Sequence, residues 1–201
     1  KTILRFPRKG SEIIHQHEIP LEWLHKKLNR SQFLILSGIL VGCTAGLSGV
    51  LLKIIVHYIH LAITKDYHFS FQLFSYFIFP VAGIMLTVVV VKYFLHGKDG
   101  KGIANILSEM AQKSSLVAPY KMYSQIISSA ITVGLGGSAG LESPIAVTGA
   151  AIGSNFSRTY RLNYKDRTLL LAAGAAAGIA SAFNAPIAGL MFSVEIFLSR
   201  V

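Results

Sequence analysis

The sequence predicts an all-α, polytopic membrane protein with tilted and discontinuous helices, and three observations lead to this fold class. First, 52% of the 201 residues are apolar and only 14% are charged, against about 25% charged in an average soluble domain. Second, apolar stretches of helical length recur along the chain. Third, glycine- or proline-containing breaks interrupt them at three places. A soluble fold needs more polar surface, so an ordinary cytosolic enzyme is disfavoured.

The formal charge of +10 is concentrated outside the apolar stretches, and seven of the 19 basic residues lie in the first 30. A basic protein with a polar surface would suggest nucleic acid. Here cations that flank membrane spans explain the balance, so no nucleic-acid partner is predicted. Leu21, Leu24 and Leu28 recur at helical spacing beside Trp23. We therefore expect residues 1–31 to form a cytoplasmic segment with an amphipathic helix, in a protein of the cell (inner) membrane.

Two long apolar stretches follow, at residues 32–64 and 71–95, the second kinked or interrupted near Pro80. The first is long enough to require a steep tilt across about 30 Å of hydrocarbon. Its glycines recur at three- and four-residue steps, which predicts one smooth face for close helix packing. These glycines are Gly38, Gly42, Gly46 and Gly49. Lys53, His57 and His60 are expected at the interface rather than in a proton relay, and the two histidines lack a third ligand for a metal.

Shorter helical pieces alternate with breaks through the rest of the chain. Helices are expected at residues 103–112, 120–135 and 143–160, and a basic connector precedes two more at 168–183 and 186–199. The breaks lie near Gly100, Gly140 and Asn184. At 16 and 14 residues, the last two helices are too short to span a bilayer comfortably. Discontinuous helices of this kind surround ion sites in membrane proteins.

The segment 136–144 carries the most specific chemistry. Glu142 is the only acid between Glu109 and Asp166, among apolar and small neighbours. Ser143 is expected as N-cap with Pro144 at the first helical position. Unpaired amides at a helix start attract anions, so the carboxylate would act as a tethered anion that a free halide must displace. The alternative is an acid that merely caps its own helix.

Three segments, in the right order, resemble the CLC family of chloride channels and transporters. Gly140-Leu141-Glu142-Ser143-Pro144 is similar to the family's G-[KR]-E-G-P segment. The stretches 171–178 and 182–189, continuing through Glu195, resemble the next family motif, and 100–104 falls where the family has G-S-G-I-P. The resemblance runs from about residue 32 to residue 200.

This resemblance implies that residues 32–201 form the N-terminal one of two inverted repeats that line a pore, in a homodimer within a lipid bilayer. The second repeat lies outside this sequence. Glu142 matches the external gating glutamate. The remaining implied contacts to chloride or related anions come from Lys101, Gly102, Ile103, Gly140, Leu141 and Ser143.

Departures from the family pattern leave the mechanism open. Lys101 replaces a serine whose hydroxyl touches the ion, so it either lines the pore or lies solvated at its mouth. Proton-coupled members commonly carry a second acid after the glutamate that matches Glu195, and here that residue is Ile196. A passive channel is therefore favoured over a chloride–proton exchanger, with Glu195 as a structural or proton-carrying acid. No enzymatic activity, cofactor or metal is predicted. An intramembrane hydrolase using Glu142 or Lys101 is the remote alternative.

Overall fold

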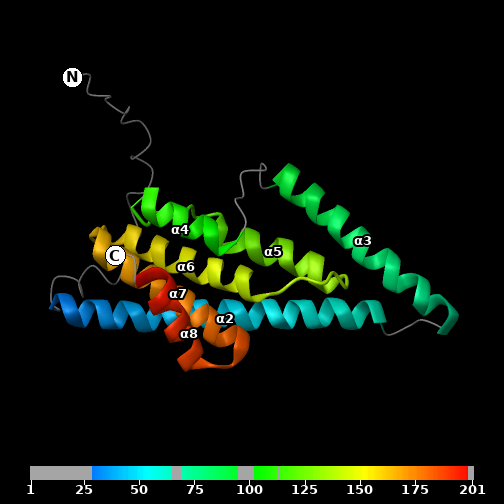
Figure 1. Cartoon of the computed structure of the whole chain (residues 1–201), viewed down its shortest axis with the longest axis horizontal. Coiled ribbons are helices and arrows are strands. Elements are labelled where there is room, and N and C mark those ends of the chain that lie inside the picture. The colour runs from blue at the N-terminus through cyan, green and yellow to red at the C-terminus, as the bar shows by residue number, and fades with distance from the viewer. Residues whose placement is uncertain (1–28, 65–68, 95–101, 113, 199–201) are drawn as a thin grey trace, which may run out of the picture.

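The computed structural model describes residues 29–64, 69–94, 102–112 and 114–198. Within these ranges the chain is helical and contains no strand, as predicted. The segment expected to hold the amphipathic helix and the connector with Lys101 lie outside the described residues. Figure 1 shows one very long helix, α2, along one side of the molecule, with the others packed against it or leaning away.

The two long helices agree with the predicted spans. Helix α2 covers Arg30–Thr64 and α3 covers Phe69–Phe94. The 35 residues of α2 reach about 52 Å at 1.5 Å per residue. By length and composition, residues Arg30–Ile63 could cross a membrane, and only 22% of their most apolar stretch is buried. Helix α3 runs through Pro80 without the interruption that the sequence suggested as one possibility.

Three helices form the packed centre. These are α5 (Lys121–Gly134), α6 (Glu142–Thr159) and α7 (Tyr164–Phe183), while α4 (Ile103–Gln112) lies against α6. The last elements are α8 (Pro186–Ser193) and a π-helical turn, η1 (Val194–Leu198). Helices α4 and α5 match their predicted bounds, with α5 shorter by one residue at each end.

Helix α7 begins four residues earlier than predicted. Its N-cap is Asn163, and Asp166 lies in its first turn, where a carboxylate favours the helix dipole. The charged residues there had indicated a connector instead. At 20 residues, α7 reaches about 30 Å, so the prediction that it is too short for a bilayer was wrong.

Glycines bring α6 and α7 into backbone contact. A Cβ on Gly149 would overlap the carbonyl of Gly174, and a Cβ on Gly174 would overlap the carbonyl of Gly149. A Cβ on Gly178 would lie 2.8 Å from the carbonyl oxygen of Ile145, also too close for an ordinary contact. The small-residue face predicted on α2 is used only in part. Gly49 contacts Ser181 and Ile145, whereas Gly38 and Gly46 face open space among the described residues.

Candidate functional site

Glu142 is the first residue of α6. Leu141 is the N-cap, and its carbonyl accepts the first helical hydrogen bond from the amide of Ile145 at 3.1 Å. The predicted N-cap, Ser143, lies inside the helix, because the turn closes on Leu141 and Pro144 has no amide that needs a partner there. The amides of Glu142 and Ser143 precede the helix's own hydrogen-bond ladder, so they are oriented to meet an anion.

The half-buried Glu142 side chain turns back over the loop that precedes the helix. A Cβ on Gly140 would overlap the Oε2 atom of Glu142, so only glycine leaves room for the carboxylate in this position. The carboxylate makes no hydrogen bond or ion pair with another described residue. Among the described residues, no capping hydrogen bond holds this carboxylate in place.

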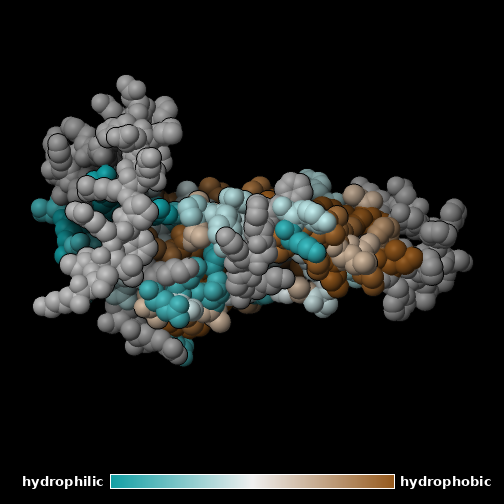
Figure 2. Space-filling model, turned by 90° about the horizontal axis from the view of Figure 1, so that it is seen from above, coloured by the Kyte–Doolittle hydropathy of each residue, from teal (hydrophilic) through white to brown (hydrophobic). Residues whose placement is uncertain are grey.

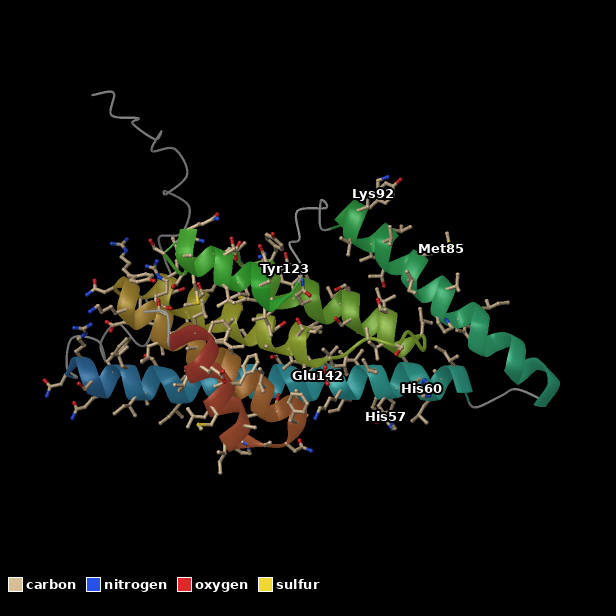
Figure 3. The ribbon with its side chains drawn as sticks, in the orientation of Figure 1. His57, His60, Met85, Lys92, Tyr123 and Glu142 are labelled. Atoms are coloured by element: carbon tan, nitrogen blue, oxygen red, sulfur yellow. The ribbon has the colours of Figure 1, made fainter. Side chains whose placement is uncertain are left out.

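This helix start faces the middle of α2. Ile145, one turn into α6, contacts the position of Gly49, which lies in the middle of α2. Figure 3 shows Glu142 beside the central part of α2, with His57 and His60 further along that helix. If α2 spans a bilayer, Glu142 lies near its centre, where ionisable groups are costly and usually functional.

A second predicted segment meets the same helix start. Gly102 has a φ of +85°, and a Cβ added to it would lie 3.5 Å from the Oγ of Ser143. Helix α4 begins at the next residue, Ile103, whose side chain packs on the buried core. The structure thus brings the starts of α4 and α6 together. Lys101 lies outside the described residues, so its position stays a prediction.

The third break approaches from α7. Asn184 ends that helix in the left-handed conformation, with φ 53°, and Pro186 starts α8. Leu141 and Ala182 pack against the same buried cluster, formed by Leu52, Ala130 and Ile145. The ends of three discontinuous helices therefore lie around the first turn of α6, as expected of a site built from backbone groups.

Lys53, which the sequence suggested lies at the membrane interface, makes a contact within the protein. It is half-buried, and its ammonium donates a hydrogen bond to the carbonyl of Ser181 at 2.7 Å. This carbonyl belongs to the last turn of α7, where the helix dipole favours a cation. The positive charge is therefore held within the protein near the third break.

Glu195 lies on the exposed side of η1, and Ile196 packs inward. Ile196 and Ile103 pack against one cluster that also contains Phe197. The position that follows Glu195 thus lies on the same core as the start of α4. Because the side chain of Ile196 has no ionisable group, it cannot relay a proton.

A buried ion pair was missed at the sequence level. The Nζ of Lys121, at the start of α5, lies 3.2 Å from the Oε2 of Glu109 on α4, with side-chain exposures of 2% and 9%. Glu109 shares the apolar face of α4 with Ile106 and Met110, and that spacing could have indicated its burial. Its partner, Lys121, lies beyond a turn and a linker, and no local sequence pattern predicts that this lysine is buried.

The histidines do not form a metal centre with their neighbours. His57 and His60 are exposed on α2 (Figure 3). In the part of the chain that the structure describes, no three His, Cys, Asp or Glu side chains gather closely enough to bind an ion.

Comparisons with known proteins find related sequences. Residues 83–201 match the family described as voltage gated chloride channel. A putative chloride channel protein ClcB-like from Ralstonia nicotianae is 33% identical over 126 residues, covering 61% of this chain. A chloride/fluoride channel protein from Pseudomonas syringae pv. tomato is 30% identical over 118 residues, or 58% of the chain. The H(+)/Cl(−) exchange transporter ClcA of Vibrio cholerae serotype O1 is 32% identical over 186 residues, or 87% of the chain.

The matched regions are only part of each relative. They cover 29% of the Ralstonia protein, 25% of the Pseudomonas protein and 38% of the Vibrio protein. The match extends over all the helices that build the site, from the second half of α3 to the end of the chain. This chain belongs to the voltage-gated chloride channel (CLC) family, whose members are integral membrane proteins.

Proposed function

We propose that this chain supplies half of the lining of a transmembrane pore for chloride or related anions, and that Glu142 gates it. The observation that carries the proposal is the start of α6, where free amides lie beneath a carboxylate that can move. The names of the relatives support chloride as the substrate, and the family assignment favours transport over the alternative of an intramembrane hydrolase.

In the proposed mechanism, the Glu142 carboxylate and a free halide compete for the amides at the start of α6. The amides of Glu142 and Ser143 and the dipole of α6 attract negative charge. The carboxylate lies over Gly140, directly before the helix start, and we infer that from there it keeps other anions away from these amides. When the carboxylate swings away or takes up a proton, a free halide can enter. The starts of α4 and α6 would then provide neighbouring anion sites, with Gly102, Ile103, Gly140, Leu141 and Ser143 as the backbone contacts and Lys101 at the inner end.

The test is anion flux from liposomes that contain the full-length protein. Glu142→Gln keeps the shape of the side chain but stays neutral, so it should raise chloride flux at neutral pH and flatten the dependence of flux on pH. Glu195→Gln tests the second acid separately, because this glutamate lies on η1 rather than at the helix start. If flux and pH response in Glu142→Gln equal those of the wild type, Glu142 is not the gate.

We favour a passive channel over a proton-coupled exchanger, because Ile196 follows Glu195. Exchange is the second candidate, supported by the Vibrio relative named an exchange transporter, which matches the larger share of the chain. A chloride gradient imposed on the proteoliposomes separates the two. A channel passes chloride without moving protons, whereas proton uptake driven by the chloride gradient would overturn the channel assignment.

We also infer that residues 32–201 act as the N-terminal repeat in a homodimer of the inner membrane, with residues 1–31 in the cytoplasm. The outer face of α8 and the start of η1 expose large apolar side chains that need cover, which supports further assembly. These are Ile187, Leu190, Met191 and Val194. The mass of the full-length protein in detergent tests the dimer, and protease access to residues 1–31 in oriented vesicles tests the orientation.

A further inference from the structure

A cavity lies where α2 begins, on the side opposite to His57 and His60. Its volume is about 390 Å³, and it lies between the first turns of α2 and the tight turn that joins α6 to α7. Its lining combines four polar or charged residues, Arg30, Arg161, Asn163 and Asp166, with the apolar side chains of Phe33 and two leucines. Figure 2 shows hydrophilic surface gathered at this end of the molecule. The cavity is remote from Glu142 and has no part in the proposed gate.

The charges around this cavity favour an anion. Arg30 and Asp166 form a two-pronged ion pair, with N–O distances of 2.8 and 3.2 Å, so their charges offset each other. Arg161 is exposed and makes no side-chain hydrogen bond or ion pair with another described residue. Its guanidinium is the uncompensated charge of the lining, and guanidinium groups bind phosphate oxygens in pairs.

The backbone of Arg161 is unusual as well. Its φ is +53°, a left-handed conformation that only glycine and, less often, asparagine or aspartate adopt at low cost. The amide of Arg161 bonds the carbonyl of Arg158 at 3.1 Å, which closes the end of α6. This turn places the Arg161 side chain at the cavity, and its backbone conformation is one that asparagine can also adopt.

The rest of the lining is apolar, and part of it belongs to α2. Phe33 is buried, and Leu34 and Leu162 complete the wall. Beyond them Ile35 and Ile39 are exposed by 65% and 58%. A ligand that fits both parts of the lining has an anionic head for Arg161 and hydrocarbon for α2.

We propose that this cavity binds a phosphate ester, namely the headgroup of an anionic phospholipid, with Arg161 as its principal cation and Asn163 as a second donor. A free phosphate would meet the same cation but would leave the apolar wall unused. The cavity lies beside the basic connector of Arg158, Arg161, Lys165 and Arg167, which the distribution of charge places at the cytoplasmic face. Anionic lipid is attracted to that face by juxtamembrane cations.

Native mass spectrometry of the full-length protein tests the proposal, with phosphatidylglycerol and phosphatidylcholine added in equal amounts. Arg161→Asn removes the cation and suits the left-handed backbone, so the fold should be kept. Arg158→Gln is the matched control, because it removes a neighbouring exposed cation that does not line the cavity. Melting temperatures of both variants establish that they are folded.

The wild type should retain phosphatidylglycerol in preference to phosphatidylcholine. Arg161→Asn should weaken that retention about fivefold, as expected for one cation at the membrane surface, and Arg158→Gln should change it less. In a second arm, inorganic phosphate competes with the lipid. Displacement at millimolar phosphate would assign the site to a soluble phosphate. Equal retention of phosphatidylglycerol by the wild type and Arg161→Asn, with no displacement by phosphate, would overturn the proposal.

Discussion

The buried ion pair between Lys121 and Glu109 predicts a large and specific loss of stability. Lys121→Met preserves the length of the aliphatic chain and removes the ammonium. The carboxylate of Glu109, only 9% exposed, then remains without the cation that lies 3.2 Å away in the wild type. Removing one member of such a pair costs about 3–5 kcal/mol, because the remaining buried charge loses its close counterion.

Replacing both residues should cost far less. In Lys121→Met/Glu109→Leu no charge stays buried, and exchange of a buried pair for apolar residues is often neutral or stabilising. The double variant should therefore be more stable than the single variant Lys121→Met, with a coupling energy of about 2–3 kcal/mol. An exposed salt bridge would have a coupling energy of at most about 1 kcal/mol. The size of the coupling energy therefore distinguishes a buried ion pair from one at the surface.

Thermal unfolding of the full-length protein in detergent measures these differences. Lys92→Met is the matched control, because Lys92 is exposed on α3 (Figure 3), and it should change stability by no more than about 0.5 kcal/mol. The expected order of melting temperature is wild type and Lys92→Met highest, the double variant close to them, and Lys121→Met lowest. If Lys121→Met has the melting temperature of the wild type, the burial argument fails. It also fails if the effects of the two substitutions on the free energy of unfolding are additive.

Two further predictions concern glycines. Gly149→Ala should destabilise the protein by about 2 kcal/mol or more, because its Cβ would overlap the Gly174 carbonyl and force α6 and α7 apart. Gly42→Ala is the control and should leave stability unchanged or raise it by up to about 1 kcal/mol, since its Cβ would lie at an ordinary 3.9 Å from the Cβ of Ala177. Equal melting temperatures for Gly149→Ala and Gly42→Ala would contradict the packing argument. Gly140→Ala should displace the Glu142 carboxylate and raise chloride flux from liposomes at neutral pH, whereas unchanged or lower flux would show that the carboxylate does not close the pore from this position.

The helices were predictable where the sequence pattern is local. The amphipathic spacing of α4 and the polar–apolar alternation of α5 located both within one residue of their observed ends. The start of α7 was not predictable, because Asp166 and its basic neighbours are as typical of a connector as of the first turn of a helix. Only the N-cap geometry of Asn163 and the tertiary partner of Asp166, Arg30, distinguish the two.

The candidate site could be predicted in residue identity but not in geometry. The isolation of Glu142 and the glycines around it are visible in the sequence. The placement of its carboxylate over Gly140, and the contact between Gly102 and Ser143, depend on how separate helices meet. The contact of Lys53 with the end of α7 is similarly non-local. Among the glycines of α2, spacing alone could not tell Gly49, which contacts α6 and α7, from Gly46, which does not.

The central claim is that the Glu142 carboxylate and a free anion compete for the start of α6. Anomalous diffraction from crystals of the full-length protein soaked in bromide tests this most directly. In Glu142→Gln, bromide should appear within hydrogen-bonding distance of the amides that follow Leu141, and in the wild type at neutral pH its occupancy there should be much lower. Equal bromide occupancy in both proteins, or none in either, would contradict the account.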